Sequence, residues 1–233
     1  MHRIWPKVAA VDPPVKRSYR SPSREARARD TRRRVRQAAA RLFVDRGYVQ
    51  TTVRDIADAA GVGIRTVHTA YPGGKPEIFH RALDAAVAGD EEPTSQRERM
   101  AASGMLDRPT ELVTHLVERT AALLDRAGPL IMTTVTSSGA DPHMRRLAGE
   151  GAAATHAQVR SVALALAQAQ LLRPGVDADH AADVLFTACS PAVHSLLRRD
   201  RAWDGARYRD WLEDLIRRTL ITEAPGPPTC APS

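Results

Sequence analysis

The chain has 233 residues, with 34 Lys or Arg against 27 Asp or Glu, and its two cysteines, Cys189 and Cys230, are far apart in sequence. A chain of this length can fold without disulfides or metals, and this cysteine content excludes a disulfide-rich secreted scaffold and a paired-cysteine metal site. No stretch approaches the roughly 18 apolar residues of a membrane span, and the N-terminus lacks the pattern of a signal peptide, so we expect a cytoplasmic protein with no membrane partner.

The positive charge is concentrated near the N-terminus. Residues 1–80 contain 17 Lys or Arg and 7 Asp or Glu, whereas residues 81–233 contain 17 and 20. A basic head on a mildly acidic body is typical of a protein that binds a polyanion, although a solvated basic face would give the same totals. Residues 1–28 are rich in Pro, Ser and Arg and lack helical periodicity, so they are predicted to be a disordered basic arm.

Three helices are predicted in the head. The first begins at Asp30 or Thr31 and ends at Gly47, because its apolar residues recur at helical spacing. Thr52 is expected to cap a second, short helix, VRDIADAA. Gly61 then turns the chain into a third, IRTVHTAY, and this pair of short helices fits a helix-turn-helix. A further helix begins near Pro76.

The rest of the chain is predicted to form an all-α body. Its helical patterns are separated by Gly, Pro and Asp and show no alternating strand pattern. The predicted helical segments are residues 109–126, 129–138, 141–172, 177–199 and 204–222. Residues 223–233, which read EAPGPPTCAPS, are expected to be a flexible tail.

Residues 31–80 resemble the DNA-binding head of the tetracycline-repressor (TetR) family of bacterial regulators. The resemblance is carried by TRRRVRQAAARLFVDRGYVQTTVRDIADAAGVGIRTVHTAYPGGKPEIF. It implies an all-α fold with a three-helix head in residues 29–75, then a connecting helix and a larger ligand-binding and dimerisation body in residues 76–222. The C-terminal run ADVLFTACSPAVHSLLRRDRAWDGARYRDWLEDLIRRTLI resembles one type of C-terminal domain in this family.

The resemblance also implies which head residues contact DNA. Arg65 is the best candidate for reading guanine, and Lys75 matches a family lysine that contacts phosphate. Gly63, His68 and Gly74 depart from the usual family residues, although His68 can still donate to a phosphate. The expected DNA-binding residues are Thr51, Thr52, Arg54, Ile64, Arg65, Thr66, His68, Thr69 and Lys75.

Two further sites are expected in the body. A ligand pocket combines apolar walls with a few polar groups, and the candidates for it are Met132, Thr133, Thr136, Ser137 and His156. The last two helices are expected to form a dimer interface through Leu196, Leu197, Tyr208, Trp211, Leu212 and Leu215. For each residue in both sets, a place in the core or on the surface of one chain is the alternative.

These patterns favour a homodimeric, ligand-responsive repressor that binds a palindromic double-stranded DNA operator. No dinucleotide, phosphate-loop, zinc-protease or nucleophile-elbow motif is present, so neither an enzyme nor a cofactor or metal is expected. An architectural helix-turn-helix protein without an inducer remains an alternative, and a helical enzyme is a remote one.

Overall fold

The computed structural model describes residues 22–89 and 111–222, with side chains from Glu25 onward. The expected arm before Pro22, the polar segment 90–110 and the tail after Thr222 lie outside these residues. The described residues form helices, with one isolated antiparallel bridge between Leu172 and Ile221. The chain is all-α, as the sequence predicts. None of the helices described is both long enough and apolar enough to cross a membrane.

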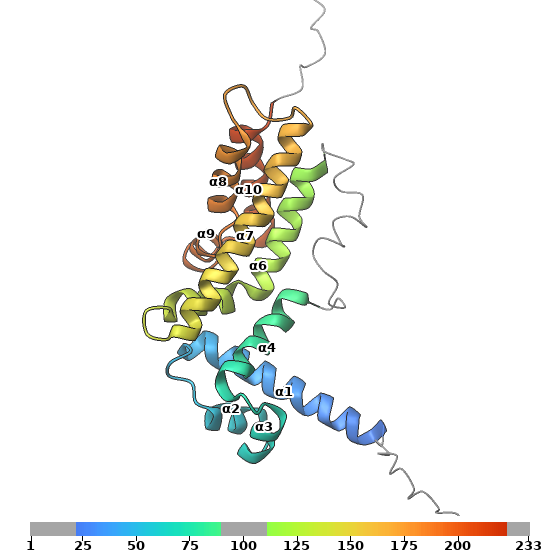
Figure 1. Cartoon of the computed structure of the whole chain (residues 1–233), viewed down its shortest axis with the longest axis vertical. Helices are drawn as coiled ribbons and strands as arrows, with labels where there is room; N and C mark the ends of the chain where they lie inside the picture. Colours follow the sequence, from blue (N-terminus) through green and yellow to red (C-terminus); the bar gives the residue numbers. More distant parts are fainter. Residues whose placement is uncertain (1–21, 90–110, 223–233) are drawn as a thin grey trace, which may run out of the picture.

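Four helices form the head at one end of the molecule (Figure 1). They are α1 (Pro22–Arg46), α2 (Val53–Ala60), α3 (Ile64–Ala70) and α4 (Gly74–Ala88). Phe43, Tyr48 and Phe79 meet at the centre of the head, with ring centroids 5.1 to 5.5 Å apart. These three aromatic side chains are almost fully buried and join α1, the loop before α2, and α4.

The first helix is longer than the sequence indicates. It begins at Pro22, so residues 22–28, which the sequence assigns to a disordered arm, are helical. Packing does not explain this extension, because the first buried side chain of α1 is Val35. Arg and Ala are good helix formers, and their abundance here lets the helix continue beyond its packed part.

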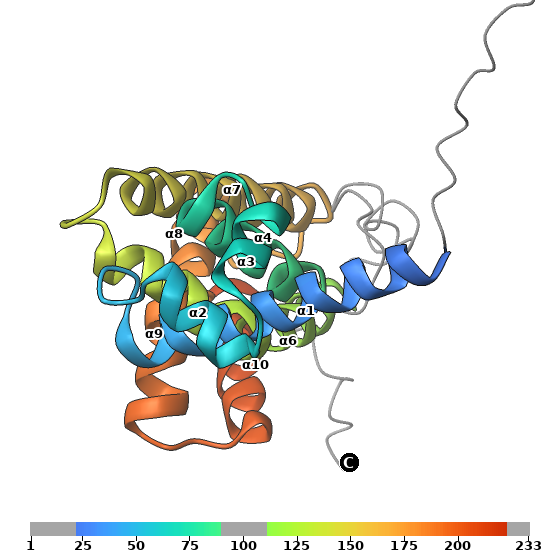
Figure 2. The ribbon, with the colours of Figure 1, turned by 90° about the horizontal axis from the view of Figure 1, so that it is seen from below.

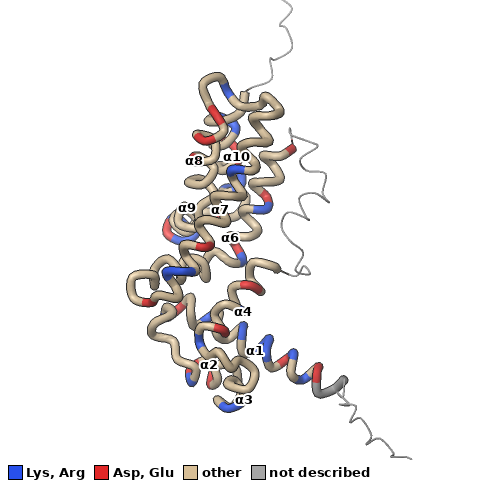
Figure 3. The backbone as a smooth tube through the Cα atoms, viewed as in Figure 1, with Lys and Arg blue, Asp and Glu red and all other residues tan. Residues whose placement is uncertain are grey.

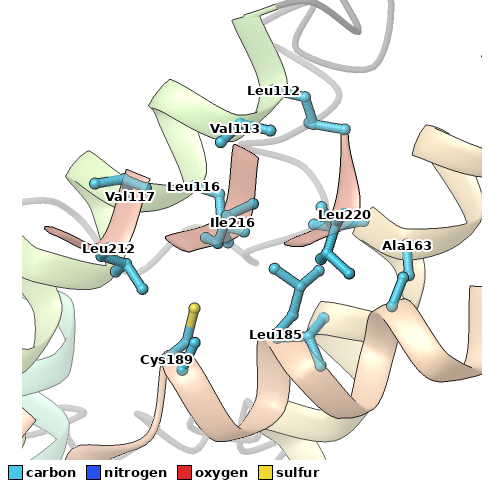
Figure 4. Close-up of a cluster of buried hydrophobic side chains, with 14 of the residues drawn as sticks. Leu112, Val113, Leu116, Val117, Ala163, Leu185, Cys189, Leu212, Ile216 and Leu220 are labelled. Carbon is cyan, nitrogen blue, oxygen red and sulfur yellow. The ribbon is translucent and has the colours of Figure 1, made fainter. Parts of the chain in front are cut away.

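The body contains two long helices and shorter ones packed beside them (Figures 1 and 2). They are α6 (Leu112–Ser137), α7 (Pro142–Gln168), α8 (Ala178–Ala188), α9 (Pro191–Ser195), one π-helical turn η3 (Leu196–Asp200) and α10 (Gly205–Leu220). Their apolar faces meet in a second core, in which Leu116, Leu185, Leu212 and Ile216 are buried (Figure 4).

Two predicted helix boundaries are wrong. Helix α6 runs through Gly128 and Pro129, where the sequence suggests a break between two segments. Proline removes one hydrogen bond of the helix, but Ala127, Gly128 and Leu130 are all buried, and this packing keeps the helix continuous. Conversely, the predicted helix 177–199 is interrupted at Cys189, and Ser190 caps a new helix by accepting the Val193 amide at 3.2 Å.

The head and the body share side chains at their junction. Leu130 of α6 and Met144 of α7 are buried in the head core. The Thr133 hydroxyl lies 3.4 Å from the Phe43 carbonyl of α1 and 3.0 Å from the Pro129 carbonyl of its own helix. A displacement of α6 or α7 would therefore move side chains that pack directly against the head.

Candidate nucleic-acid interface

A sharp turn sets α3 across α2. Gly61 has φ +63°, a conformation that favours glycine, and its amide donates to the Asp58 carbonyl at 3.1 Å. From α1, the Arg34 guanidinium donates to the Ala60 carbonyl at 2.6 Å and so holds the end of α2. The sequence analysis missed this role of Arg34, because 26 positions separate the two partners.

The start of α2 is a complete capping box. The Thr52 hydroxyl accepts the Asp55 amide, and the Asp55 carboxylate accepts both the amide and the hydroxyl of Thr52, at 2.8 and 2.6 Å. The expected Thr52 cap is confirmed. However, both Thr52 donors are already satisfied by Asp55, so an approaching phosphate would have to compete for them. The three-residue spacing from Thr52 to Asp55 is the sequence signal of this box.

Replacing Thr52 with Ala tests the box. We expect Thr52→Ala to lower the free energy of unfolding by about 1 kcal/mol near pH 7, because an N-cap is lost. The Thr52 side chain and amide lower the pKa of Asp55, so the hydrogen bonds that the carboxylate accepts stabilise the fold above the unfolded-state pKa, and this part is lost as acid protonates the folded carboxylate. Urea unfolding at neutral and acid pH measures both effects. Thr66→Ala, at an exposed position of α3, is the control, and an equal loss in it would contradict the prediction.

The prediction that the Thr51 side chain contacts DNA is wrong. It is fully buried, and its hydroxyl donates to the Gly47 carbonyl at 2.8 Å and the Leu42 carbonyl at 3.2 Å. The hydroxyl therefore holds the turn between α1 and α2 and is not available to a phosphate. Arg54, by contrast, is exposed on the first turn of α2.

Helix α3 turns one side to solvent and one to the head core. Val67 is fully buried and fixes the helix. Gly63 precedes the helix and offers no side-chain cap. The residues on the exposed side are those expected to face DNA, namely Ile64, Arg65, Thr66, His68 and Thr69. Such an exposed side, carried on a helix that the core holds rigidly, has the geometry needed to enter a major groove.

Lys75 lies at the start of α4 and reaches back to the loop before α2. Its ammonium group lies 4.4 Å from the centre of the Tyr48 ring and donates to the Tyr48 carbonyl at 3.1 Å. Burial lowers the pKa of Lys75, and Asp141 opposes this shift. Burial likewise raises the pKa of Tyr48 to about 12. The ammonium thus links α4 to this loop, and its contact with a phosphate stays a prediction.

The expected pocket residues differ in burial and do not line the hollow of about 430 Å³ between α8 and α10. Thr133 and Ser137 are buried, but Thr133 belongs to the head junction, and the Thr136 side chain is exposed. Met132 is half-buried on the same helix. His156 is exposed on α7, where its ring packs edge-on against Phe186. His156 is therefore corrected from a pocket residue to a surface residue.

The expected dimer residues divide into two groups. Tyr208 and Leu212 are fully buried within one chain, so they belong to its core. Their prediction as dimer-interface residues is therefore wrong. Trp211, Leu215 and Leu197 are only partly buried, and Leu196 is 53% exposed. An open hollow of about 430 Å³ lies between α8 and α10 and is lined by Asp183, Val184, Thr187, Ala188, Val193, Trp211 and Leu215.

Next to Val193, which lines this hollow, lies a polar cluster that the sequence did not predict. The buried His194 ring lies 3.1 Å from Asp125 of α6, which also accepts from Arg198 at 3.2 Å. Burial lowers the pKa of His194, although Asp125 opposes the shift. The cluster fastens α9 to α6. Since 69 positions separate His194 from Asp125, no local pattern could have indicated it.

Comparison with known proteins identifies the head. Residues 35–82 match the family model of bacterial regulatory proteins of the tetR family. The matched segment runs from the packed part of α1 into α4, so it contains the turn, the capping box and the exposed side of α3. No curated protein sequence matches the chain.

Solved structures of regulators have the same fold over most of the chain. A protein assigned as a transcriptional regulator from Saccharomonospora viridis, crystallised with choline, is 22% identical with a TM-score of 0.62. NalD, the secondary repressor of the MexAB-OprM multidrug efflux pump of Pseudomonas aeruginosa, is 21% identical with a TM-score of 0.63. For both, the similarity covers 84% of this chain and 100% of the other. The MbdR regulator from Azoarcus sp. CIB is 18% identical with a TM-score of 0.63, over 82% and 100%.

Proposed function

We propose that this chain, a TetR-family transcriptional regulator by its residues 35–82, acts in the cytoplasm as a homodimeric repressor that a small molecule releases from a palindromic operator. Regulators of this family bind DNA and are not enzymes. The observation that carries the proposal is the arrangement of α3, whose exposed residues follow a turn fixed by Gly61, Arg34 and the buried Val67.

The chemistry of the exposed side of α3 supports sequence reading. Arg65 can offer two parallel donors to the O6 and N7 atoms of guanine. Ile64, which is 40% exposed, can contact a thymine methyl group. Arg54 and His68 are exposed beside them and can contact phosphates, which supply most of the affinity without reading sequence.

A dimer would place two such helices on one operator. One α3 of seven residues reads only a few base pairs, and a second copy about 34–36 Å away would read the next turn of the same face of DNA. The partly exposed Trp211 and Leu215 supply the apolar surface for that association. The domain division that follows is a DNA-binding head in residues 29–75 and a ligand-binding and dimerisation body in residues 76–222.

Release by an effector would use the junction between head and body. A small molecule bound among the body helices would shift α6 or α7, and the shift would reach α1 through Leu130, Thr133 and Met144. Couplings of this kind are typically worth about 1–3 kcal/mol. The choline complex of the S. viridis protein places a small organic molecule in a protein of this fold and suggests that class of effector for this chain.

Selection of binding sites from random DNA, followed by measurement on Arg65→Ala, tests the proposal. The unmodified protein should enrich a palindrome. The variant should lose about 1–3 kcal/mol on that palindrome and relax its preference at one base pair in each half-site. Arg119→Ala, which removes one exposed charge from α6 in the body, is the control and should leave DNA binding unchanged. Equal losses on the palindrome and on random DNA would reduce Arg65 to a phosphate contact, and failure to enrich any sequence would favour an architectural protein.

A further inference from the structure

The part of α1 that projects from the head has an unusual surface. Figures 1 and 2 show its first turns extending away from the other helices, and Val35 is its first buried residue. With a rise of about 1.5 Å per residue, the segment from Pro22 to Val35 is about 20 Å long, and it contacts the end of α3 through the Arg32 carbonyl. Its sequence holds many arginines and few acidic residues, and Figure 3 shows Lys and Arg along it.

Four of these arginines form a stripe along one side of α1. Arg29, Arg32, Arg33 and Arg36 follow the i, i+3, i+4, i+7 spacing that usually marks an apolar face. Arg29, Arg32 and Arg33 are exposed, and Arg36 is half-buried. Asp30 lies 2.5 Å from Arg33 and is the acidic partner found for this stripe among the described residues. Like charges one turn apart destabilise an isolated helix, so a bound polyanion would relieve this repulsion.

The arginine stripe lies next to the C-terminal end of α3. Tyr71, which directly follows α3, donates its hydroxyl to the Arg32 carbonyl at 2.9 Å. Burial raises the pKa of Tyr71, and the neighbouring Arg36 opposes this shift. In Figure 1, α1 slopes so that its first turns lie at the same end of the molecule as α3. The stripe therefore starts beside the C-terminal end of α3 and runs outward from it along α1.

We propose that the arginine stripe binds the phosphate backbone of operator DNA beside the base pairs that α3 reads. The inference rests on the proposed function and extends its footprint. The stripe from Arg29 to Arg36 spans about 10 Å, which corresponds to about three base pairs at 3.4 Å each. Because the phosphates are the same at every base pair, a contact of these arginines with the backbone adds affinity without sequence preference.

Arg29→Ala with Arg33→Ala tests the stripe in the full-length protein. Alanine preserves helix propensity, so α1 should remain helical. In a dimer that loses four phosphate contacts, the slope of log K against log salt concentration should become shallower by about 3.6. Affinity should fall by about tenfold or more, equally on operator and random DNA, and hydroxyl-radical protection of the flanking base pairs should be lost.

Two controls and one comparison separate the outcomes. Arg29→Lys with Arg33→Lys keeps the charges and should keep the slope, whereas Arg119→Ala with Arg199→Ala removes two exposed charges from the body and should leave it unchanged. An unaltered slope and footprint in the Ala variant would overturn the stripe. That result together with a normal Arg65→Ala effect would leave the proposed function standing. If the Ala variant had a shallower salt slope but the unmodified protein showed no sequence preference, the stripe would be supported and the proposed repressor function would be wrong.

Discussion

Replacing Leu215 with Glu is expected to convert the proposed dimer into a monomer and to abolish operator binding. Leu215 is partly buried and lines the hollow between α8 and α10 with Trp211 and Val184. In a two-fold interface each substitution counts twice, and a carboxylate buried there without a partner is strongly unfavourable. We expect at least a hundredfold loss of operator affinity, on the order of 3 kcal/mol or more, although the head is unchanged.

Sedimentation and operator titration measure this result. Ala122→Glu introduces the same charge at an exposed position of α6 and should leave the assembly intact. Circular dichroism should show that Leu215→Glu keeps its helices, since the side chain is only partly buried. If the variant remained a dimer, Leu215 would belong to the core of one chain, and the two heads would have to be held by another surface.

Replacing Phe79 with Ala is expected to cost about 3–5 kcal/mol of stability. Its ring is fully buried and meets Phe43 at 5.1 Å and Tyr48 at 5.4 Å, both edge-on. Removing it leaves a cavity where α1, the loop before α2, and α4 meet, next to Leu130 of the body. Urea unfolding should show the loss, and DNA binding should weaken because α3 depends on this core.

The volume-preserving change Phe79→Leu serves as the matched control. It should cost much less, because most of the buried apolar volume is retained. If the Ala and Leu variants were equally stable, the aromatic cluster would not be the main support of the head. The prediction also implies that unfolding in the Ala variant begins in the head while the body core around Leu185 and Ile216 persists.

The head was the most predictable part of the molecule. Its structure depends on neighbours within a few residues: Thr52 with Asp55, Gly61 with Asp58, and the outward side of α3 that follows from one buried residue, Val67. Local spacing therefore indicated the cap, the turn and the residues exposed on α3. Besides the start of α1, the hydroxyl of Thr51 is mispredicted, because its burial depends on how the turn folds over α1.

The body required the tertiary structure. Helical periodicity placed Tyr208, Leu212 and Leu215 on one face, but it could not say that the body core buries the first two and leaves the third partly open. Packing also decided that α6 continues through Pro129 and that His194 meets Asp125 across 69 positions. The sequence by itself determined an all-α chain with a helix-turn-helix head, because these follow from contacts close in sequence. Which body side chains become core and which remain surface follows from contacts between distant segments, and those exist only in the folded molecule.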